Sequence, residues 1–320
     1  MSVLPFEIVK KDLESCEEIL LSATKISDEF VENIAQHLLK SGGKRLRPAL
    51  CILSARAGKK FDLEKTLPIA AALELIHTAS LVHDDVIDES QLRRGRKTTN
   101  ALFGNQSAIL SGDFLFARAF KLISARDYGT RVSMKLAELV EDLSVGEITQ
   151  DRFEFQIVEE SKYLERIEKK TAGFLSTACE LGAIVSEMDE IDLQKLSSYG
   201  KFIGLAFQIT DDILDIIGDE KNLGKKAGAD LKQGIITLPV IYALEKDSGR
   251  LQQLVTNPNM TDEDIFEAIE MIKSTDAIDR SKNLADDYLD RAKKILPDDI
   301  QPEIFETFVS AADFIGKRNF

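Results

Sequence analysis

Apolar residues recur at intervals of three and four along nearly the whole chain, for example at Ile69, Leu73 and Ile76. This spacing places their side chains on one face of an α-helix. Alternation of polar and apolar residues, which is typical of strands, is scarce. We therefore expect an all-α protein.

Clusters of glycine, proline and polar residues divide the helical pattern. They fall at residues 41–43, 58–60, 104–105, 127–129, 218–234 and 257–259. Such clusters favour turns and helix ends. Because most of these connections are short and no repeat of fixed period occurs, we predict one domain spanning residues 1–320, and neither two domains nor a solenoid.

Two segments, 67–82 and 203–217, are apolar on nearly all faces and meet acidic residues at their C-terminal ends. Helices that are apolar all round usually lie in the protein interior. Carboxylates at the ends of such helices are costly to bury unless they are paired or bind a metal ion. Both acidic ends therefore require a partner.

Each acidic end contains the pattern Asp-Asp-x-x-Asp. The first motif is Asp84, Asp85 and Asp88, and the second motif is Asp211, Asp212 and Asp215. Residues four apart share a helix face, so the outer aspartates of each motif present two carboxylates toward one point. A hard divalent cation relieves their repulsion, and oxygen ligands of this kind suit magnesium. A solvated acidic face would explain one copy, but two identical copies after apolar helices favour metal binding.

Basic and polar residues accompany both motifs. They are Lys44 and Arg47 after a glycine pair, His77 two turns before Asp84, Arg93 and Arg94 after the first motif, Lys170 and Thr171, and Lys225 in a glycine-bounded loop. Arginine pairs favour bidentate contacts with phosphate oxygens. Each group alone would also fit a solvated turn, a helix start or, for His77, the core. His83 lies off the line joining His77 to Asp84, and we assign it a structural role.

The charge balance restricts the ligands. With a net charge of −14, no basic block and no tryptophan, the chain lacks the features of a nucleic-acid-binding protein. An acidic protein holds an anionic ligand through divalent cations and a few focused basic side chains.

The cysteines and the N-terminus indicate the compartment. Cys16, Cys51 and Cys179 have no paired spacing, so we expect neither a disulfide framework nor a zinc site. The N-terminus has no signal-peptide pattern, and no run of eighteen apolar residues predicts a transmembrane segment. We expect a cytoplasmic protein.

Taken together, these residues give the whole chain a resemblance to the trans-isoprenyl (polyprenyl) diphosphate synthases, closest to the medium-chain, long-chain and geranylgeranyl enzymes. The matching stretches are 42–48, 74–77, 84–88 with 93–95, 112–113, 146–147, 170–172, 207–215 and 224–239. The resemblance implies a single orthogonal bundle of helices around a deep central cavity, with the two motifs facing each other across its mouth, and a homodimer.

The resemblance also implies the reaction and its participants. Three magnesium ions held by the two motifs would bind an allylic diphosphate (geranyl, farnesyl or geranylgeranyl), whose cation is attacked by isopentenyl diphosphate, with the proton lost to the departing diphosphate. By resemblance, isopentenyl diphosphate is held by Lys44, Arg47, His77 and Arg94, and the allylic diphosphate by Arg93, Lys170, Gln208 and Lys225. Thr171 would help shape the allylic pocket, so that Lys170, Thr171, Gln208 and Lys225 form the catalytic set.

Product length is expected to depend on the residues one turn before the first motif. Ala79 and Ser80 are small there, where short-chain relatives often carry an aromatic residue, so the tunnel for the growing tail should stay open. We expect a product of at least C20 and favour C30 to C40.

One departure and two alternatives accompany the resemblance. Many relatives have a lysine where this chain has Ile235, so the resemblance implies that one phosphate contact is lost here. The alternatives are a catalytic or non-catalytic subunit of a hetero-oligomeric prenyl synthase, and a terpene cyclase. The two intact motifs argue against a non-catalytic subunit, and a cyclase commonly keeps one motif.

Overall fold

The structure is a computed structural model that describes residues 5–40, 43–93, 95–218, 227–246 and 249–317. It is 77% helical, which confirms the all-α prediction. Contacts between Cα atoms group the chain into two compact units. Unit 1 is Met1–Val140, Thr177–Ser197 and Pro297–Phe308, and unit 2 is Glu141–Ser176, Ser198–Leu296 and Val309–Phe320. The single domain over 1–320 remains a prediction.

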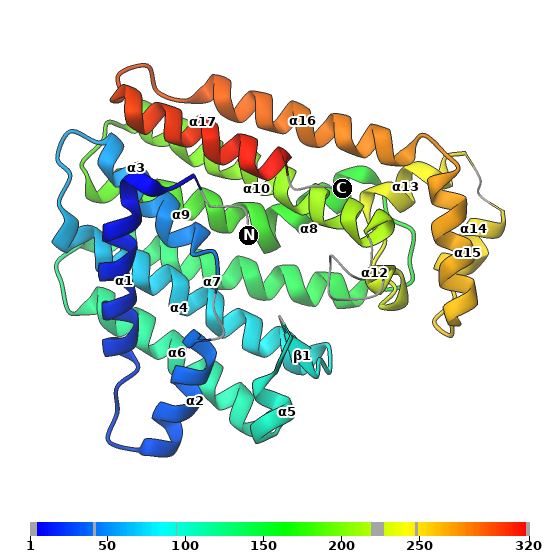
Figure 1. The fold of residues 1–320 in the computed structure, drawn as a ribbon, viewed down its shortest axis with the longest axis horizontal. Helices are drawn as coiled ribbons and strands as arrows, with labels where there is room; N and C mark the ends of the chain where they lie inside the picture. Colours follow the sequence, from blue (N-terminus) through cyan, green and yellow to red (C-terminus); the bar gives the residue numbers. More distant parts are fainter. Residues whose placement is uncertain (1–4, 41–42, 94, 219–226, 247–248, 318–320) are drawn as a thin grey trace. The chain divides into compact units, whose positions relative to one another are not determined.

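Unit 1 is built around one long helix. The elements that lie entirely within its first stretch, Met1–Val140, are η1 (Glu7–Val9), α1 (Lys10–Ala23), α2 (Glu29–Lys40), α3 (Leu46–Ala57), α4 (Leu63–Ile87), β1 (Leu92–Arg93), β2 (Arg96–Lys97), α5 (Thr99–Phe103) and α6 (Asn105–Ser124). Helix α4 contacts α1, α3, α5 and α6 (Figure 1). Its predicted apolar segment is buried on nearly every face, as expected for an interior helix.

Helix α4 begins and ends at aspartates. Asp62 caps its N-terminus by accepting a hydrogen bond from the backbone N–H of Lys65. Asp88 caps the C-terminus, so the first motif occupies the last turn. Gly112 allows α6 to pack closely against this turn, because an added Cβ would lie 2.2 Å from His83 Nε2. His83 thus contacts α6, consistent with its structural assignment.

A short antiparallel hairpin follows α4. Strand β1 pairs with β2 through Leu92↔Lys97 and Arg93↔Arg96, and Gly95 supplies the positive φ of the turn. The sequence pattern did not predict this hairpin, because strands of two residues are too short for alternation to be recognised.

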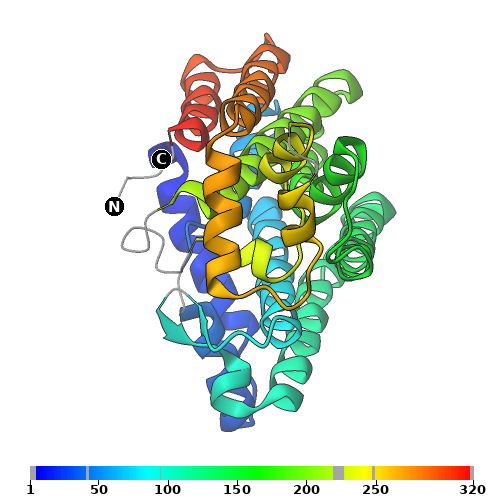
Figure 2. The same cartoon turned by 90° about the vertical axis from the view of Figure 1, so that its right-hand side faces the viewer.

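Several helices lie entirely within unit 2. They are α8 (Glu160–Ile167), η2 (Glu168–Ala172), α12 (Ala229–Lys232), α13 (Leu238–Leu244), α14 (Arg250–Val255), α15 (Asp262–Lys273) and α16 (Ala277–Ile295). Figure 2 faces α15, which contacts α13, α14 and α16. Helices with residues of both units are α7 (Gly129–Arg152), α9 (Gly173–Val185), α10 (Glu190–Ile217) and α17 (Pro302–Gly316).

Two glycines bring α10 unusually close to its neighbours within unit 2. A Cβ on Gly204 would lie 2.5 Å from Ala172 Cα, and a Cβ on Gly200 would lie 2.4 Å from the carbonyl oxygen of Leu175. Only glycine permits this approach of one backbone to another. The same face continues one turn further to Gln208.

Among the described residues, one helix is long and apolar enough to span a membrane by length and composition, namely α4. Of its apolar window, 78% is buried inside the protein. A core helix of a soluble protein meets the same criterion, so this finding gives little support for a membrane span.

Candidate active site

The first motif places three carboxylates at the C-terminal end of α4. Asp84 and Asp85 lie in its last turn, and the backbone N–H of Asp88 donates to the Asp84 carbonyl at 2.8 Å. A helix C-terminus carries partial negative charge and is normally complemented by basic side chains. The last turn of α4 has none. This end of the helix therefore favours a bound cation.

The middle carboxylate of the first motif is paired with an arginine. Asp85 is 5% exposed, and Arg93 Nε donates to its Oδ1 at 2.8 Å. Burial raises the pKa of Asp85, and Arg93 opposes this rise. Asn100 holds the intervening turn in place, because its amide donates to the carbonyl oxygens of Asp85 and Ser90. Sequence reasoning missed Asn100.

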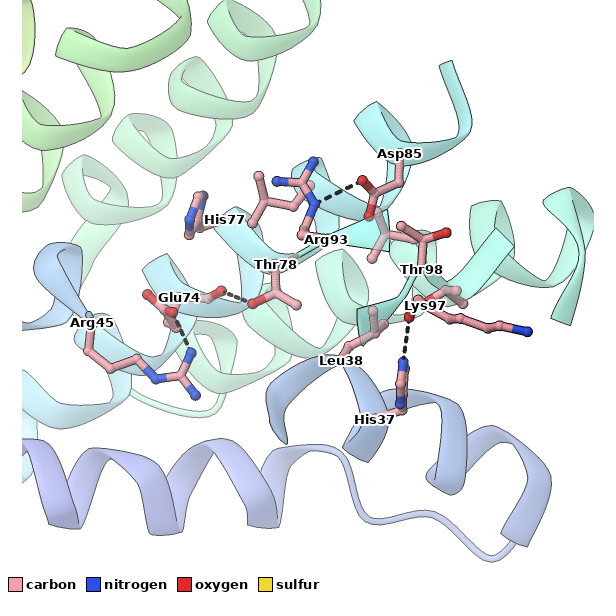
Figure 3. A pocket seen from close by; sticks show the side chains of 13 residues that line it. His37, Leu38, Arg45, Glu74, His77, Thr78, Asp85, Arg93, Lys97 and Thr98 are labelled. Atoms are coloured by element: carbon pink, nitrogen blue, oxygen red, sulfur yellow. Dashed lines mark hydrogen bonds and ion pairs between the residues drawn. The ribbon is translucent and has the colours of Figure 1, made fainter. Parts of the chain in front are cut away.

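A cavity lies beside these residues in unit 1 (Figure 3). Its lining includes His77, Asp85 and Arg93, which the resemblance assigned to isopentenyl diphosphate, metal and allylic diphosphate, respectively. His37 of α2 lines another part of the cavity, and its ring nitrogen Nε2 lies 3.3 Å from the carbonyl oxygen of Lys97. The cavity therefore gathers one residue from each of three predicted groups.

Arg45, between the predicted ligands Lys44 and Arg47, also lines this cavity. Its guanidinium bonds Glu17, donates to Glu74 at 2.6 Å and donates to the carbonyl oxygen of Leu39 at 3.1 Å. Burial lowers the pKa of Arg45, but the two carboxylates more than compensate. Arg45 thus fixes the start of α3 against α1 and α4.

The backbone at Arg45 has φ +48°, in the left-handed region. Lys44 is exposed and Arg47 half-buried on either side of it. Sequence reasoning identified these two flanking residues as phosphate ligands and missed Arg45, because its carboxylate partners Glu17 and Glu74 lie far away in the sequence.

The predicted chain-length residues occupy different environments on α4. Ala79 is fully buried, whereas Ser80 is half-buried and its hydroxyl donates to the carbonyl oxygen of His77 at 3.0 Å. Both side chains are small, so neither fills the space that a large aromatic side chain would occupy.

The second motif lies in the last two turns of α10, in unit 2, and the last turn of this helix again carries no basic residue. Its middle carboxylate, Asp212, is 3% exposed. Tyr163 donates to Oδ2 at 2.7 Å, and Gln208 donates to Oδ1 at 2.8 Å. Burial raises the pKa of Asp212 to about 6, against the lowering effect of these hydrogen bonds. Tyr163 was missed at the sequence level.

The predicted catalytic residues Thr171 and Gln208 are in direct contact. The Thr171 hydroxyl donates to Gln208 Oε1 at 2.7 Å, which the close approach at Gly204 makes possible. Thr171 lies in η2, a single π-helical turn, and such turns are frequent at functional sites.

Lys170 lies in the same turn and faces α7. Its ammonium group is 2.6 Å from Glu147 Oε2 and 3.3 Å from Gln150 Oε1. Glu147 and Gln150 thus position the lysine that the resemblance assigns to the allylic diphosphate.

Asp215 connects the second motif to the chain that follows it. Its Oδ2 accepts a hydrogen bond from the Asp230 N–H at 3.0 Å, and its carbonyl accepts one from the Gly228 N–H at 2.8 Å. Further along, Arg166 donates to the carbonyl oxygen of Ile236 at 2.9 Å. These bonds hold both ends of segment 228–236 near α8 and α10.

The donor set in each motif fits a hard divalent cation bound jointly with phosphate. No group of three or more histidine, cysteine, aspartate or glutamate side chains is arranged to hold a metal among the residues that the structure describes. Magnesium usually binds through one or two carboxylates together with waters and substrate phosphates. Outer aspartates at two helix ends meet that requirement.

Two predicted ligands, Arg94 and Lys225, lie outside the described residues. The other predicted residues fall into two groups. Unit 1 holds Lys44, Arg47, His77, Ala79, Ser80, Asp84, Asp85, Asp88 and Arg93, and unit 2 holds Lys170, Thr171, Gln208, Asp211, Asp212 and Asp215.

Comparisons with known proteins identify the family. A profile of the polyprenyl synthetase family matches residues 28–272. The chain is 40% identical over 316 residues to heptaprenyl diphosphate synthase component 2 of Geobacillus stearothermophilus, covering 98% of each chain.

Solved structures agree. The heptaprenyl diphosphate synthase of Staphylococcus aureus has a TM-score of 0.92 and 36% identity, covering 98% of this chain and 99% of that one. The polyprenyl synthase of Caulobacter crescentus, solved with calcium and isoprenyl diphosphate, has a TM-score of 0.91 and 33% identity, covering 99% and 97%. These matches confirm the isoprenoid-synthase fold and the resemblance. The chain belongs to the polyprenyl synthetase family and is a prenyl-transferring enzyme, a prenyl diphosphate synthase.

Proposed function

We propose that this enzyme condenses isopentenyl diphosphate with an allylic diphosphate and releases diphosphate, giving an all-trans polyprenyl diphosphate of C30 to C40. The observation that carries the proposal is the pair of aspartate motifs at helix C-termini that have no basic residue of their own. Because the negative charge of the helix end and the carboxylates add together, each end favours divalent cations shared with a diphosphate.

Within each motif we assign different tasks to the aspartates. Asp84 and Asp88 of the first motif, and Asp211 with Asp215 of the second, would hold the cations, three in all by family resemblance. Asp85 and Asp212 are buried, and their carboxylates already accept hydrogen bonds from side chains of the protein. We propose that these two middle aspartates act chiefly as supports, because side chains bond them, whereas Oδ2 of the equally buried Asp215 accepts from the backbone N–H of Asp230. Bound magnesium would neutralise the diphosphate and make it a leaving group.

The basic residues would orient the two substrates. Lys44, Arg47, His77 and Arg94 are proposed to hold isopentenyl diphosphate, and Arg93, Lys170, Gln208 and Lys225 the allylic diphosphate. The His77–Arg93 cavity of unit 1 supports this assignment for His77 and Arg93, since it offers cationic and hydrogen-bonding groups together.

Thr171 and Gln208 would stand beside the developing allylic cation. The hydrogen bond between them orients the Thr171 oxygen and the Gln208 amide together. Fixed dipoles stabilise developing charge without having to reorganise during the reaction. Electrophilic attack by a carbon cation needs no protein nucleophile, and none is assigned.

Small side chains at Ala79 and Ser80 support a long product, because neither is the aromatic residue that often blocks the tunnel in short-chain relatives. Two of the similar proteins are named heptaprenyl diphosphate synthases, and seven isoprene units fall within the C30 to C40 range. We place the enzyme in the cytoplasm, where buried, unpaired Cys16, Cys51 and Cys179 would stay reduced.

A second candidate is a catalytic subunit that works only with a partner chain. The observation that favours it is the relative from Geobacillus stearothermophilus, which is named as component 2 of its synthase. A homodimer is the first candidate, by family resemblance.

The test is an assay of the purified chain alone with magnesium, farnesyl diphosphate and labelled isopentenyl diphosphate. Elongation to C30 or longer by the chain alone supports the first candidate. Elongation only after addition of a second protein component supports the subunit. A cyclised hydrocarbon, or no incorporation in either condition, would contradict the proposal.

A further inference from the structure

A fully buried tyrosine contacts the second aspartate motif. Tyr163 lies on α8, is 0% exposed, and donates its hydroxyl to Asp212 Oδ2 at 2.7 Å. A buried tyrosine hydroxyl needs a partner, but a backbone carbonyl would satisfy it equally well. Here the partner is a carboxylate of the motif, 49 residues later in the chain.

The second oxygen of Asp212 is engaged as well. Gln208 donates to Oδ1 at 2.8 Å, and Thr171 in turn donates to Gln208. Four side chains therefore form one continuous series, in which Asp212 accepts from both sides. With both oxygens engaged, the Asp212 carboxylate is held in one rotamer, and the turn of α10 that carries the motif is tied to α8 at this point.

Arg166 reinforces the tyrosine from the next turn of α8. Its guanidinium lies 5.6 Å from the centre of the Tyr163 ring, and it donates to the Ile236 carbonyl. The side chain is 8% exposed. Tyr163 therefore has little freedom to leave Asp212, because the ring is enclosed and one of its neighbours is itself fixed.

We infer that Tyr163 is a positioning residue for metal binding: its hydroxyl, with Gln208, fixes Asp212 so that Asp211 and Asp215 are oriented toward divalent cations. This inference rests on the proposed function. Tyr163 touches neither substrate nor cation in this account and acts through Asp212. Outer partners of this kind typically alter metal affinity or activity about 10- to 100-fold when removed.

The test is Tyr163→Phe, which keeps the buried ring and removes only the hydroxyl. Its readouts are direct Mn²⁺ binding followed by electron paramagnetic resonance, and the Mg²⁺ concentration giving half-maximal elongation. We expect the Mn²⁺ dissociation constant and the half-saturating Mg²⁺ concentration each to rise about tenfold. Tyr242→Phe is the matched control, since Tyr242 is also a buried tyrosine of unit 2, bonded to Glu160. It should leave both values unchanged.

A double-mutant comparison removes the remaining ambiguity. Adding Tyr163→Phe to Asp212→Asn should raise the Mn²⁺ dissociation constant less than twofold further, because the bond is already altered. If Tyr163→Phe lowers only the melting temperature, and Mn²⁺ and Mg²⁺ values match the parent, the inference is overturned and the tyrosine is structural. If the parent itself fails to bind Mn²⁺ or elongate, the proposed function fails, and this inference with it.

Discussion

The two aspartate motifs have the same sequence pattern, yet the protein supports their middle carboxylates in different ways. In unit 1, Asp85 is paired with the guanidinium of Arg93, which a short hairpin brings to it. In unit 2, Asp212 accepts hydrogen bonds from the neutral groups of Tyr163 and Gln208. A spacing of aspartates thus predicts where carboxylates are, and the tertiary partners decide what each one does.

The electrostatic consequence differs as well. Burial raises the pKa of both carboxyl groups, and for Asp212 it reaches about 6. A guanidinium supplies a full positive charge, whereas a hydroxyl and an amide supply only dipoles. The charge of Arg166 also lowers the pKa of Asp212, but it is not bonded to the carboxylate, so the two middle aspartates differ in the charge of their bonded partners.

The largest expected loss of activity comes from substituting the outer aspartates. We propose that these aspartates have the same role in both motifs. Asp84→Asn and Asp211→Asn should each lower kcat/KM about 10³-fold or more, because a lost metal ligand removes several kcal/mol of charge stabilisation. Steady-state kinetics with farnesyl and isopentenyl diphosphates measure this. Asp299→Asn, an exposed aspartate outside both motifs, is the control. A loss below tenfold in either variant would remove that motif from the site.

The next effect tests the packing that supports the second motif alone. Gly204→Ala would place a Cβ 2.5 Å from Ala172 Cα and separate α10 from η2. We expect a loss of about 1–3 kcal/mol in the free energy of unfolding. We also expect a fall of about 100-fold in kcat, as Thr171 and Gln208 move apart.

Gly146→Ala provides the comparison on α7. Its added Cβ would lie 3.4 Å from Lys169 Cβ, an ordinary contact, so the helix should gain about 0.5–1 kcal/mol. Urea unfolding measures both variants. Equal stability for the two variants would contradict the close-approach explanation.

A smaller effect, on the free energy of unfolding, should distinguish the Asp85–Arg93 ion pair from the Asp212–Tyr163 hydrogen bond. Double-mutant cycles on the free energy of unfolding should give about 1 kcal/mol for Asp85 with Arg93, which is partly exposed, and about 2 kcal/mol for Asp212 with Tyr163. Raising the salt concentration from about 0.05 M to about 0.5 M should weaken the first coupling and leave the second nearly unchanged. Equal salt dependence would mean that the two supports do not differ in kind.

The variant with the smallest expected effect on rate should instead change the length of the product. Ala79→Phe places an aromatic side chain one turn before the first motif and should shorten the product, while the second motif is untouched. Chromatography of the reaction products measures chain length. Ala70→Phe is the control, since Ala70 is equally buried but nine residues earlier, on the opposite face of α4. Unchanged length in Ala79→Phe would refute the tunnel assignment.

Sequence reasoning recovered the helices and the motifs because both depend on local spacing. The predicted apolar segments 67–82 and 203–217 lie inside α4 and α10, and the predicted break at 127–129 separates α6 from α7. The aspartates were found through motifs of fixed spacing, whereas the roles predicted for Lys170, Thr171 and Gln208 came from the family resemblance.

What sequence reasoning missed depends on contacts between distant residues. Tyr163 precedes Asp212 by 49 residues, and Arg45 precedes Glu74 by 29. No local pattern distinguishes a tyrosine that holds a carboxylate from one that only fills the core. The glycine spacing of Gly200 and Gly204 was available, and close helix packing can be suspected from such a spacing.

The most direct test of the central claim is a Mn²⁺ titration, followed by electron paramagnetic resonance, with a non-reactive analogue of an allylic diphosphate. If both motifs bind one metal-coordinated diphosphate, the analogue should tighten Mn²⁺ binding to the parent enzyme, and either Asp84→Asn or Asp211→Asn should abolish that tightening. Parent-like tightening in either variant would show that its motif does not share the ligand, and would contradict the account.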